Sequence, residues 1–87
     1  MYSVVVRRRV LRQIERVPQS VRRRLAILLE QLGEKGPLQP GWANYGKLSP
    51  NKYHCHLTRD WVACWYWQKG TIEIEVYYVG SRQDAHY

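Results

Sequence analysis

The chain has 87 residues, of which 45% are hydrophobic, and a formal net charge of +7. This length suits one small domain, and the composition is globular rather than disordered. No apolar run approaches the roughly 18 residues needed to cross a bilayer, and the start lacks the order of a signal peptide. We therefore expect a single cytoplasmic domain over residues 1–87 that does not bind a membrane. Its two cysteines should be reduced and buried.

Basic residues are concentrated near the N-terminus. Eight of the fourteen lysines and arginines lie between Arg7 and Arg24, against a single acid, Glu15. Such an excess favours a polyanionic partner: nucleic acid, an anionic membrane surface or an acidic protein. The alternative is a solvated basic helix face.

The first half of the chain predicts a strand and two helices. Tyr2–Arg7 contains three consecutive valines, which suit a pleated surface. Apolar residues recur at helical spacing over Arg8–Val17, and a proline then ends that helix. Ser20 is the expected N-cap of a second helix, which should end at Gly33 or Gly36. The short connection favours an antiparallel helix pair.

The second half predicts antiparallel strands. After a proline-containing loop we expect a short strand at Asn44–Leu48, two strands joined by a turn at Arg59-Asp60, and a last strand at Thr71–Val79. Helices followed by a run of strands indicate an α+β fold. The N-terminal strand and the helix pair should pack on one face of a small, mainly antiparallel β-sheet, which leaves the other face for function.

The turn between the two central strands predicts which of their residues pair, and alternation predicts which residues of the last strand point inward. A two-residue turn at Arg59-Asp60 would place Thr58 opposite Trp61. The remaining expected pairs are His56 with Ala63, His54 with Trp65, and Cys55 with Cys64. In the last strand, the residues expected to point inward are Ile72, Ile74, Val76 and Tyr78.

Strand alternation also gathers ionisable side chains. Lys52, His54 and His56 should share one face, with Tyr53, Cys55 and Leu57 on the other. Histidine has an unperturbed pKa close to neutral pH, so this face is a candidate site for proton transfer next to an anion. Two alternatives stand beside it. The H-x-H spacing also suits zinc, with His86 as the only evident third ligand, and His54 could simply be a cross-strand partner of Trp65.

The order of elements, the stretch G-K-L-S-P-N-K-Y-H-C-H-L, the aromatic strand after it and the ending V-Y-Y-V-G-S-R-Q-D-A-H-Y resemble the RelE/ParE toxin superfamily. For the RelE branch the resemblance implies a toxin of a type II toxin–antitoxin system that cleaves mRNA on the ribosome without a metal or other cofactor. It also implies a cognate acidic antitoxin, with operator DNA bound only through the antitoxin complex. ParE-like members instead act on DNA gyrase.

The resemblance also implies roles for individual residues. His54 and His56 match two positions often held by lysines in a Y-x-x-x-L strand, and one of them would be the general base. Arg82 would bind the phosphate. Either Tyr87 or His86 would act as the acid or stack on a base. Auxiliary phosphate contacts would come from Lys47 and Lys52.

One position departs from the family pattern. Family ribonucleases commonly carry an arginine in the strand after the turn, and here that place falls on Val62 or Ala63. Neither side chain can bind phosphate, although Arg59 in the turn could substitute. The sequence thus favours a variant ribonuclease site. It leaves open a gyrase inhibitor, or an inactive relative that binds only antitoxin and DNA.

Overall fold

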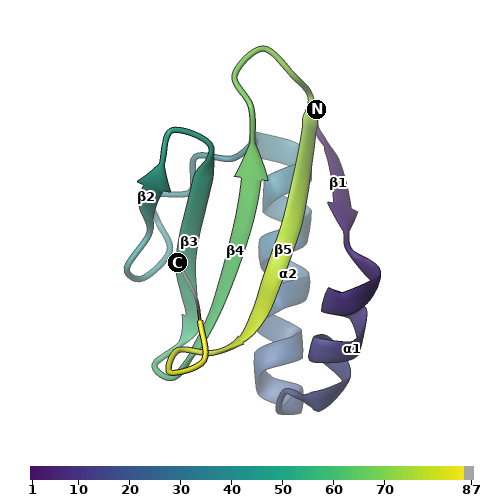
Figure 1. Ribbon diagram of the computed structural model, residues 1–87, viewed down its shortest axis with the longest axis vertical. Helices are drawn as coiled ribbons and strands as arrows, with labels where there is room; N and C mark the ends of the chain where they lie inside the picture. Colours follow the sequence, from purple (N-terminus) through teal and green to yellow (C-terminus); the bar gives the residue numbers. More distant parts are fainter. Residues whose placement is uncertain (86–87) are drawn as a thin grey trace.

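The structure is a computed structural model that describes residues 1–85. In chain order its elements are β1 (Ser3–Val6), α1 (Arg8–Arg16), α2 (Gln19–Lys35), β2 (Gly46–Ser49), β3 (Lys52–Thr58), β4 (Trp61–Trp67) and β5 (Glu73–Ser81). The strands form one sheet in the order β1-β5-β4-β3-β2, in which β1 and β5 are parallel and the other pairs antiparallel. Helix α2 runs behind the sheet, and α1 lies beyond the end of β1 alongside β5 (Figure 1). The expected α+β fold is confirmed.

The two helices meet at a proline, which changes one expectation. Pro18 is itself the N-cap of α2, and its carbonyl accepts hydrogen bonds from the N–H groups of Val21 and Arg22. Ser20 therefore lies inside the first turn, and the expectation that it is the N-cap was wrong. Pro18 already has a fixed φ of −57° and leads directly into the helix. Leu11, one of the apolar residues that recur at helical spacing in α1, is 51% exposed.

Gly36 ends α2 in a left-handed conformation, with φ at 96°. Its N–H donates to the Leu32 carbonyl at 3.0 Å, and a Cβ at this position would lie 2.7 Å from the Tyr2 ring. We expect Gly36→Ala to lower the free energy of unfolding by about 1–3 kcal/mol. Urea denaturation measures this. Gly41→Ala is the control, because a Cβ at Gly41 meets nothing within 4 Å. Equal midpoints for the two variants would contradict the expectation.

A β-bulge near Leu57 changes the register between β3 and β4. Thr58 pairs with Trp61 as expected, but beyond the bulge His56 pairs with Val62, and His54 with Cys64. The expected pairs of His56 with Ala63 and His54 with Trp65 were therefore wrong by one residue. Leu57 is the extra residue of β3 at this bulge, and it lies in the core with an exposure of 2%.

The two cysteines lie on opposite faces of the sheet, so the expected pairing of Cys55 with Cys64 was also wrong. Cys55 pairs with Ala63 in the core beneath the helices, whereas Cys64 pairs with His54 on the open face. Both thiols are free and buried. Burial raises the pKa of Cys55 to about 12 and that of Cys64 to about 11. Such thiols are poor nucleophiles at neutral pH.

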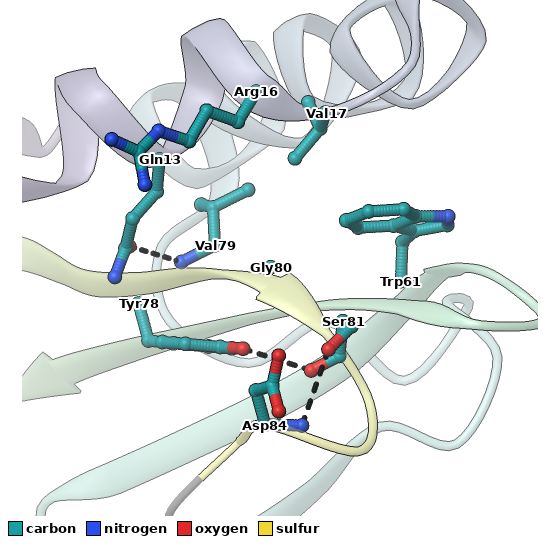
Figure 2. A pocket seen from close by; sticks show the side chains of 9 residues that line it. All are labelled: Gln13, Arg16, Val17, Trp61, Tyr78, Val79, Gly80, Ser81 and Asp84. Atoms are coloured by element: carbon teal, nitrogen blue, oxygen red, sulfur yellow. Dashed lines mark hydrogen bonds between the residues drawn. The ribbon is translucent and has the colours of Figure 1, made fainter.

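A second bulge shifts the register between β4 and β5 at Cys64 and Trp65, so the residues of β5 beyond it point to the opposite face from the one expected. Ile74 and Val76 are buried as expected, but Val79 takes the next core position and Tyr78 turns to the open face. Ile72 precedes the strand and is 67% exposed, so the inward placement of Ile72 and Tyr78 was wrong. Beyond the end of β1, α1 covers the edge of β5. There the Gln13 Oε1 atom accepts a hydrogen bond from the Val79 N–H at 3.0 Å (Figure 2).

Candidate functional site

Strand β3 presents its ionisable residues on the sheet face that the helices leave open. Lys52, His54 and His56 are half-buried. The residues between them (Tyr53, Cys55 and Leu57) are at most 2% exposed and belong to the helix-facing core. The predicted alternation of β3 is thus confirmed.

His56 is held from two directions. Its backbone N–H donates to the Ala43 carbonyl at 2.8 Å, and its ring Nδ1 lies 3.2 Å from the Asn44 amide nitrogen. Asn44 has a φ of 53°, a conformation that asparagine tolerates better than most residues. An amide nitrogen only donates, so this contact makes Nδ1 the acceptor and leaves the proton of the neutral ring on Nε2. With the amide oxygen and nitrogen exchanged, the oxygen accepts from Nδ1–H and Nε2 is unprotonated. In this arrangement His56 can accept a proton from a ligand.

His54 sits over a glycine on the neighbouring strand. Gly46 is its partner in β2, and a Cβ on Gly46 would lie 3.2 Å from the His54 Nε2 atom. The absence of a side chain at Gly46 therefore makes room for the imidazole. Burial, followed by the nearby His56 imidazole, lowers the pKa of His54.

The lowered pKa of His54 makes a prediction about stability. A histidine with a lower pKa in the folded state binds fewer protons there than in the unfolded state, so stability falls as the pH drops below the unfolded pKa of about 6.5. We expect wild-type protein to lose stability more steeply below that pH than His54→Gln does. Urea midpoints of both proteins over a pH series measure this difference. Parallel profiles would show that the folded protein does not disfavour the His54 cation.

A cleft of about 290 Å³ brings three of the predicted residues together. His56 contributes from β3, Arg59 from the β3–β4 turn, and Arg82 from the segment after β5. Arg24 and Asn44 also line it. A ligand that enters this cleft therefore meets the histidine and the arginines together.

Arg82 is placed by a backbone contact. Its N–H donates to the Asp60 carbonyl at 2.8 Å, which holds the chain after β5 against the β3–β4 turn. Figure 1 shows this segment bending back across the end of the sheet where β3 and β4 join. The tail therefore delivers Arg82 to the cleft that His56 lines. The predicted residues His86 and Tyr87 lie outside the described residues.

The two predicted lysines do not line this cleft. The Lys52 Nζ atom lies over the rings of Tyr66 and Tyr77, 5.4 and 5.8 Å from their centroids. Lys47 pairs with Tyr53 on the helix-facing side of the sheet, and its Nζ atom lies 5.7 Å from the centroid of the Tyr53 ring. Lys52 shares a face with the histidines, whereas Lys47 does not.

The two positions predicted for the family arginine face opposite sides of the sheet. Val62 lies directly opposite His56 on the same face and is fully buried, whereas Ala63 points into the core. Of these two positions, Val62 is the one that shares the open face with the histidines. Arg24 of α2, which lines the cleft, was not singled out from the sequence. Helical periodicity marked it as one of several exposed cations, and only the fold brings it beside β3.

Another cavity, of about 320 Å³, lies between α1 and the end of β5 (Figure 2). Its lining includes Gln13, Val17, Trp61 and Val79 but no histidine. We therefore place the candidate site at the cleft of His56. Within residues 1–85 no group of three His, Cys, Asp or Glu side chains is arranged to hold a metal ion. No helix in that range is long and apolar enough to cross a membrane.

Neither a protein-family model nor a curated protein sequence matches the chain. Solved toxin structures match it over most of its length. A chain of the archaeal RelE–RelB complex from Pyrococcus horikoshii OT3 is 15% identical, with a TM-score of 0.75, and the match covers 97% of this chain and 98% of that one.

Two further structures agree with this result. The E. coli toxin RelE mutant bound to an antitoxin RelBc peptide is 18% identical, with a TM-score of 0.73 and coverage of 97% of this chain and 85% of that one. The YoeB–YefM complex from Staphylococcus aureus is 12% identical, with a TM-score of 0.71 and coverage of 100% and 99%. This chain therefore has the RelE-like toxin fold.

Proposed function

We propose that this chain is the toxin of a type II toxin–antitoxin system and cleaves mRNA on the ribosome. One observation carries the proposal: His56, Arg59 and Arg82, from three separate segments, line a single cleft in a chain with the RelE-like toxin fold. A proton acceptor surrounded by guanidinium groups suits attack at a phosphodiester.

The proposed reaction uses a nucleophile that RNA itself supplies. The 2′-oxygen attacks the adjacent phosphorus, the bond from phosphorus to the 5′-oxygen breaks, and the products are a 2′,3′-cyclic phosphate and a 5′-hydroxyl. The Nε2 atom of His56 takes the 2′-OH proton, with the Asn44 amide turned so that its oxygen accepts from Nδ1–H. Arg82 and Arg59 offset the charge that develops on the phosphorane oxygens. Proton donation to the leaving 5′-oxygen is assigned to Tyr87 or His86 as a prediction.

Geometry favours His56 over His54 as the general base. His56 lines the cleft with the arginines, whereas His54, two residues earlier in β3, lies over Gly46. We assign His54 to orienting the substrate beside His56. Lys52 would contact the RNA on the same face, and the role predicted for Lys47 would require RNA to reach around the β2 edge.

The proposed partners are the ribosome with its mRNA and a cognate acidic antitoxin. Several similar structures are complexes with an antitoxin or with YefM, and the basic stretch from Arg7 to Arg24 suits an acidic segment. Operator DNA would be bound only through the antitoxin complex, and the proposed location is the cytoplasm. No metal or other cofactor takes part in the proposed reaction.

A second function is favoured by Val62. An apolar residue opposite His56 leaves the open face with one cation fewer than the ribonuclease pattern requires. A ParE-like gyrase inhibitor, or an inactive relative that binds only antitoxin and DNA, would not need that cation.

Induced expression separates these functions. After induction, the cells should stop growing. Mapping of mRNA 5′ ends should then show cuts that are phased to codons. A gyrase inhibitor would instead cause arrest with intact mRNA and damaged DNA, and an inactive relative would cause no arrest. Either of these results would contradict the proposed reaction.

A further inference from the structure

Arg24 reaches the edge of the sheet from the opposite side to the tail. It belongs to α2, behind the sheet, yet it lines the same cleft as His56 and Arg82. Its Nε–H donates to the Leu57 carbonyl at 3.1 Å, at the β-bulge that shifts the register of β3. The bulge thus offers a main-chain acceptor to a side chain from the helix layer.

A second contact orients the guanidinium plane. The Arg24 Cζ atom lies 4.9 Å from the centroid of the Trp42 ring. The Trp42 indole N–H in turn donates to the Gln31 side chain at 2.8 Å, which ties the ring to α2. Arg24 is therefore held at its Nε atom and on one face, although its side chain is exposed. A guanidinium fixed in this way loses less entropy when it binds a ligand.

The fixed guanidinium still has donors to offer. Arginine has five N–H groups. Of the five in Arg24, only Nε–H donates a hydrogen bond to another of residues 1–85. In the same range the one ion pair joins Arg7 to Glu75, so Arg24, Arg59 and Arg82 are not neutralised by carboxylates. Three such cations around one cleft favour an anion with several oxygens, and arginine binds phosphate as a two-pronged fork.

We propose that Arg24 binds a phosphate of single-stranded RNA in this cleft and supplies the cation that Val62 cannot. The assignment rests on the proposed function, because it takes RNA as the ligand of the cleft. Arg24 approaches from the helix side and Arg82 from the tail, so the two would contact the RNA backbone from opposite sides of His56. The cleft would thus hold the backbone with guanidinium groups from α2, the turn and the tail, rather than with one from β4.

RNA binding tests this directly. The probe is a short, fluorescent single-stranded RNA with 2′-O-methyl groups, which can bind but has no nucleophile. Its Kd is measured by fluorescence anisotropy over a series of salt concentrations. Arg24→Gln should weaken binding about tenfold and reduce the slope of log Kd against log salt by about 0.7, the contribution of one phosphate contact. Arg24→Lys should keep the slope and recover only part of the affinity, because lysine lacks the fork.

Arg23→Gln is the matched control, because Arg23 is an exposed arginine of the same helix and the charge change is identical. It should leave the slope unchanged. Equal slopes for Arg23→Gln and Arg24→Gln would overturn the proposal, because they would reduce Arg24 to one cation among many on α2. In the wild-type protein, the NMR signal of the Arg24 Nε–H should shift on addition of the RNA while that of Arg23 does not. This measurement needs no variant to fold.

The outcomes separate this inference from the reaction. A reduced slope for Arg24→Gln together with intact ribosomal mRNA would support the Arg24 contact and contradict the cleavage. Cleavage by wild-type protein with an unchanged Arg24→Gln slope would contradict Arg24 alone. A wild-type protein that does not bind the RNA, and shows no shift of the Arg24 signal, would overturn the Arg24 contact.

Discussion

Arg82→Ala is expected to slow mRNA cleavage on the ribosome by about 10²- to 10³-fold, the usual effect of removing one fixed donor to a developing anion. Arg82 lies in the cleft of His56, and its backbone N–H is bonded to the Asp60 carbonyl at 2.8 Å. Alanine keeps that backbone contact and removes the side chain beyond Cβ, the guanidinium included. The fold should therefore survive while stabilisation of the phosphorane is lost.

The measurement for Arg82 is single-turnover cleavage of labelled mRNA bound to ribosomes. Lys69→Ala is the control, because Lys69 is an exposed cation between β4 and β5 that does not line the cleft. Melting temperatures of both variants check that the fold is retained. If both variants cut mRNA at the same rate, Arg82 does not contact the reacting phosphate.

The second large effect is expected at His56. His56→Ala should slow cleavage by about 10²- to 10⁴-fold, the range for loss of a general base. His54→Ala should have a smaller effect, because His54 sits over Gly46 rather than in the cleft. Added imidazole should partly restore cleavage by His56→Ala, since a small base can enter the space left by the side chain.

The comparison of the two histidines decides their roles. Rescue by imidazole in His56→Ala and not in His54→Ala is the expected result, measured in the same single-turnover assay. The opposite pattern, with the larger loss and the rescue at His54, would assign the base to the other histidine.

Much of the fold could be predicted from local patterns. Period-two alternation placed Lys52, His54 and His56 on one face, and that placement holds. Helical spacing and the chain-breaking residues Pro18 and Gly36 marked the helices to within a few residues. These features depend on neighbours in the sequence, which is why the sequence alone reveals them.

The cleft depends on contacts that the sequence does not show. The bulge near Leu57 moves every β3–β4 pair beyond it by one residue. Arg24 reaches β3 only through the packing of α2, and its bond to Leu57 spans 33 positions of the chain. Likewise, the tail meets the β3–β4 turn through the backbone of Arg82 and Asp60. Such meetings are set by tertiary packing.

One measurement tests the proposed chemistry most directly. Ribosomes are programmed with mRNA that carries a single 2′-deoxynucleotide at the cleavage position, and purified toxin is added. Unmodified mRNA is expected to be cut to a 2′,3′-cyclic phosphate and a 5′-hydroxyl, while the deoxy mRNA stays intact. Cleavage of both at equal rates would contradict attack by the 2′-oxygen, and absence of cleavage in both would contradict a ribonuclease site at the cleft of His56.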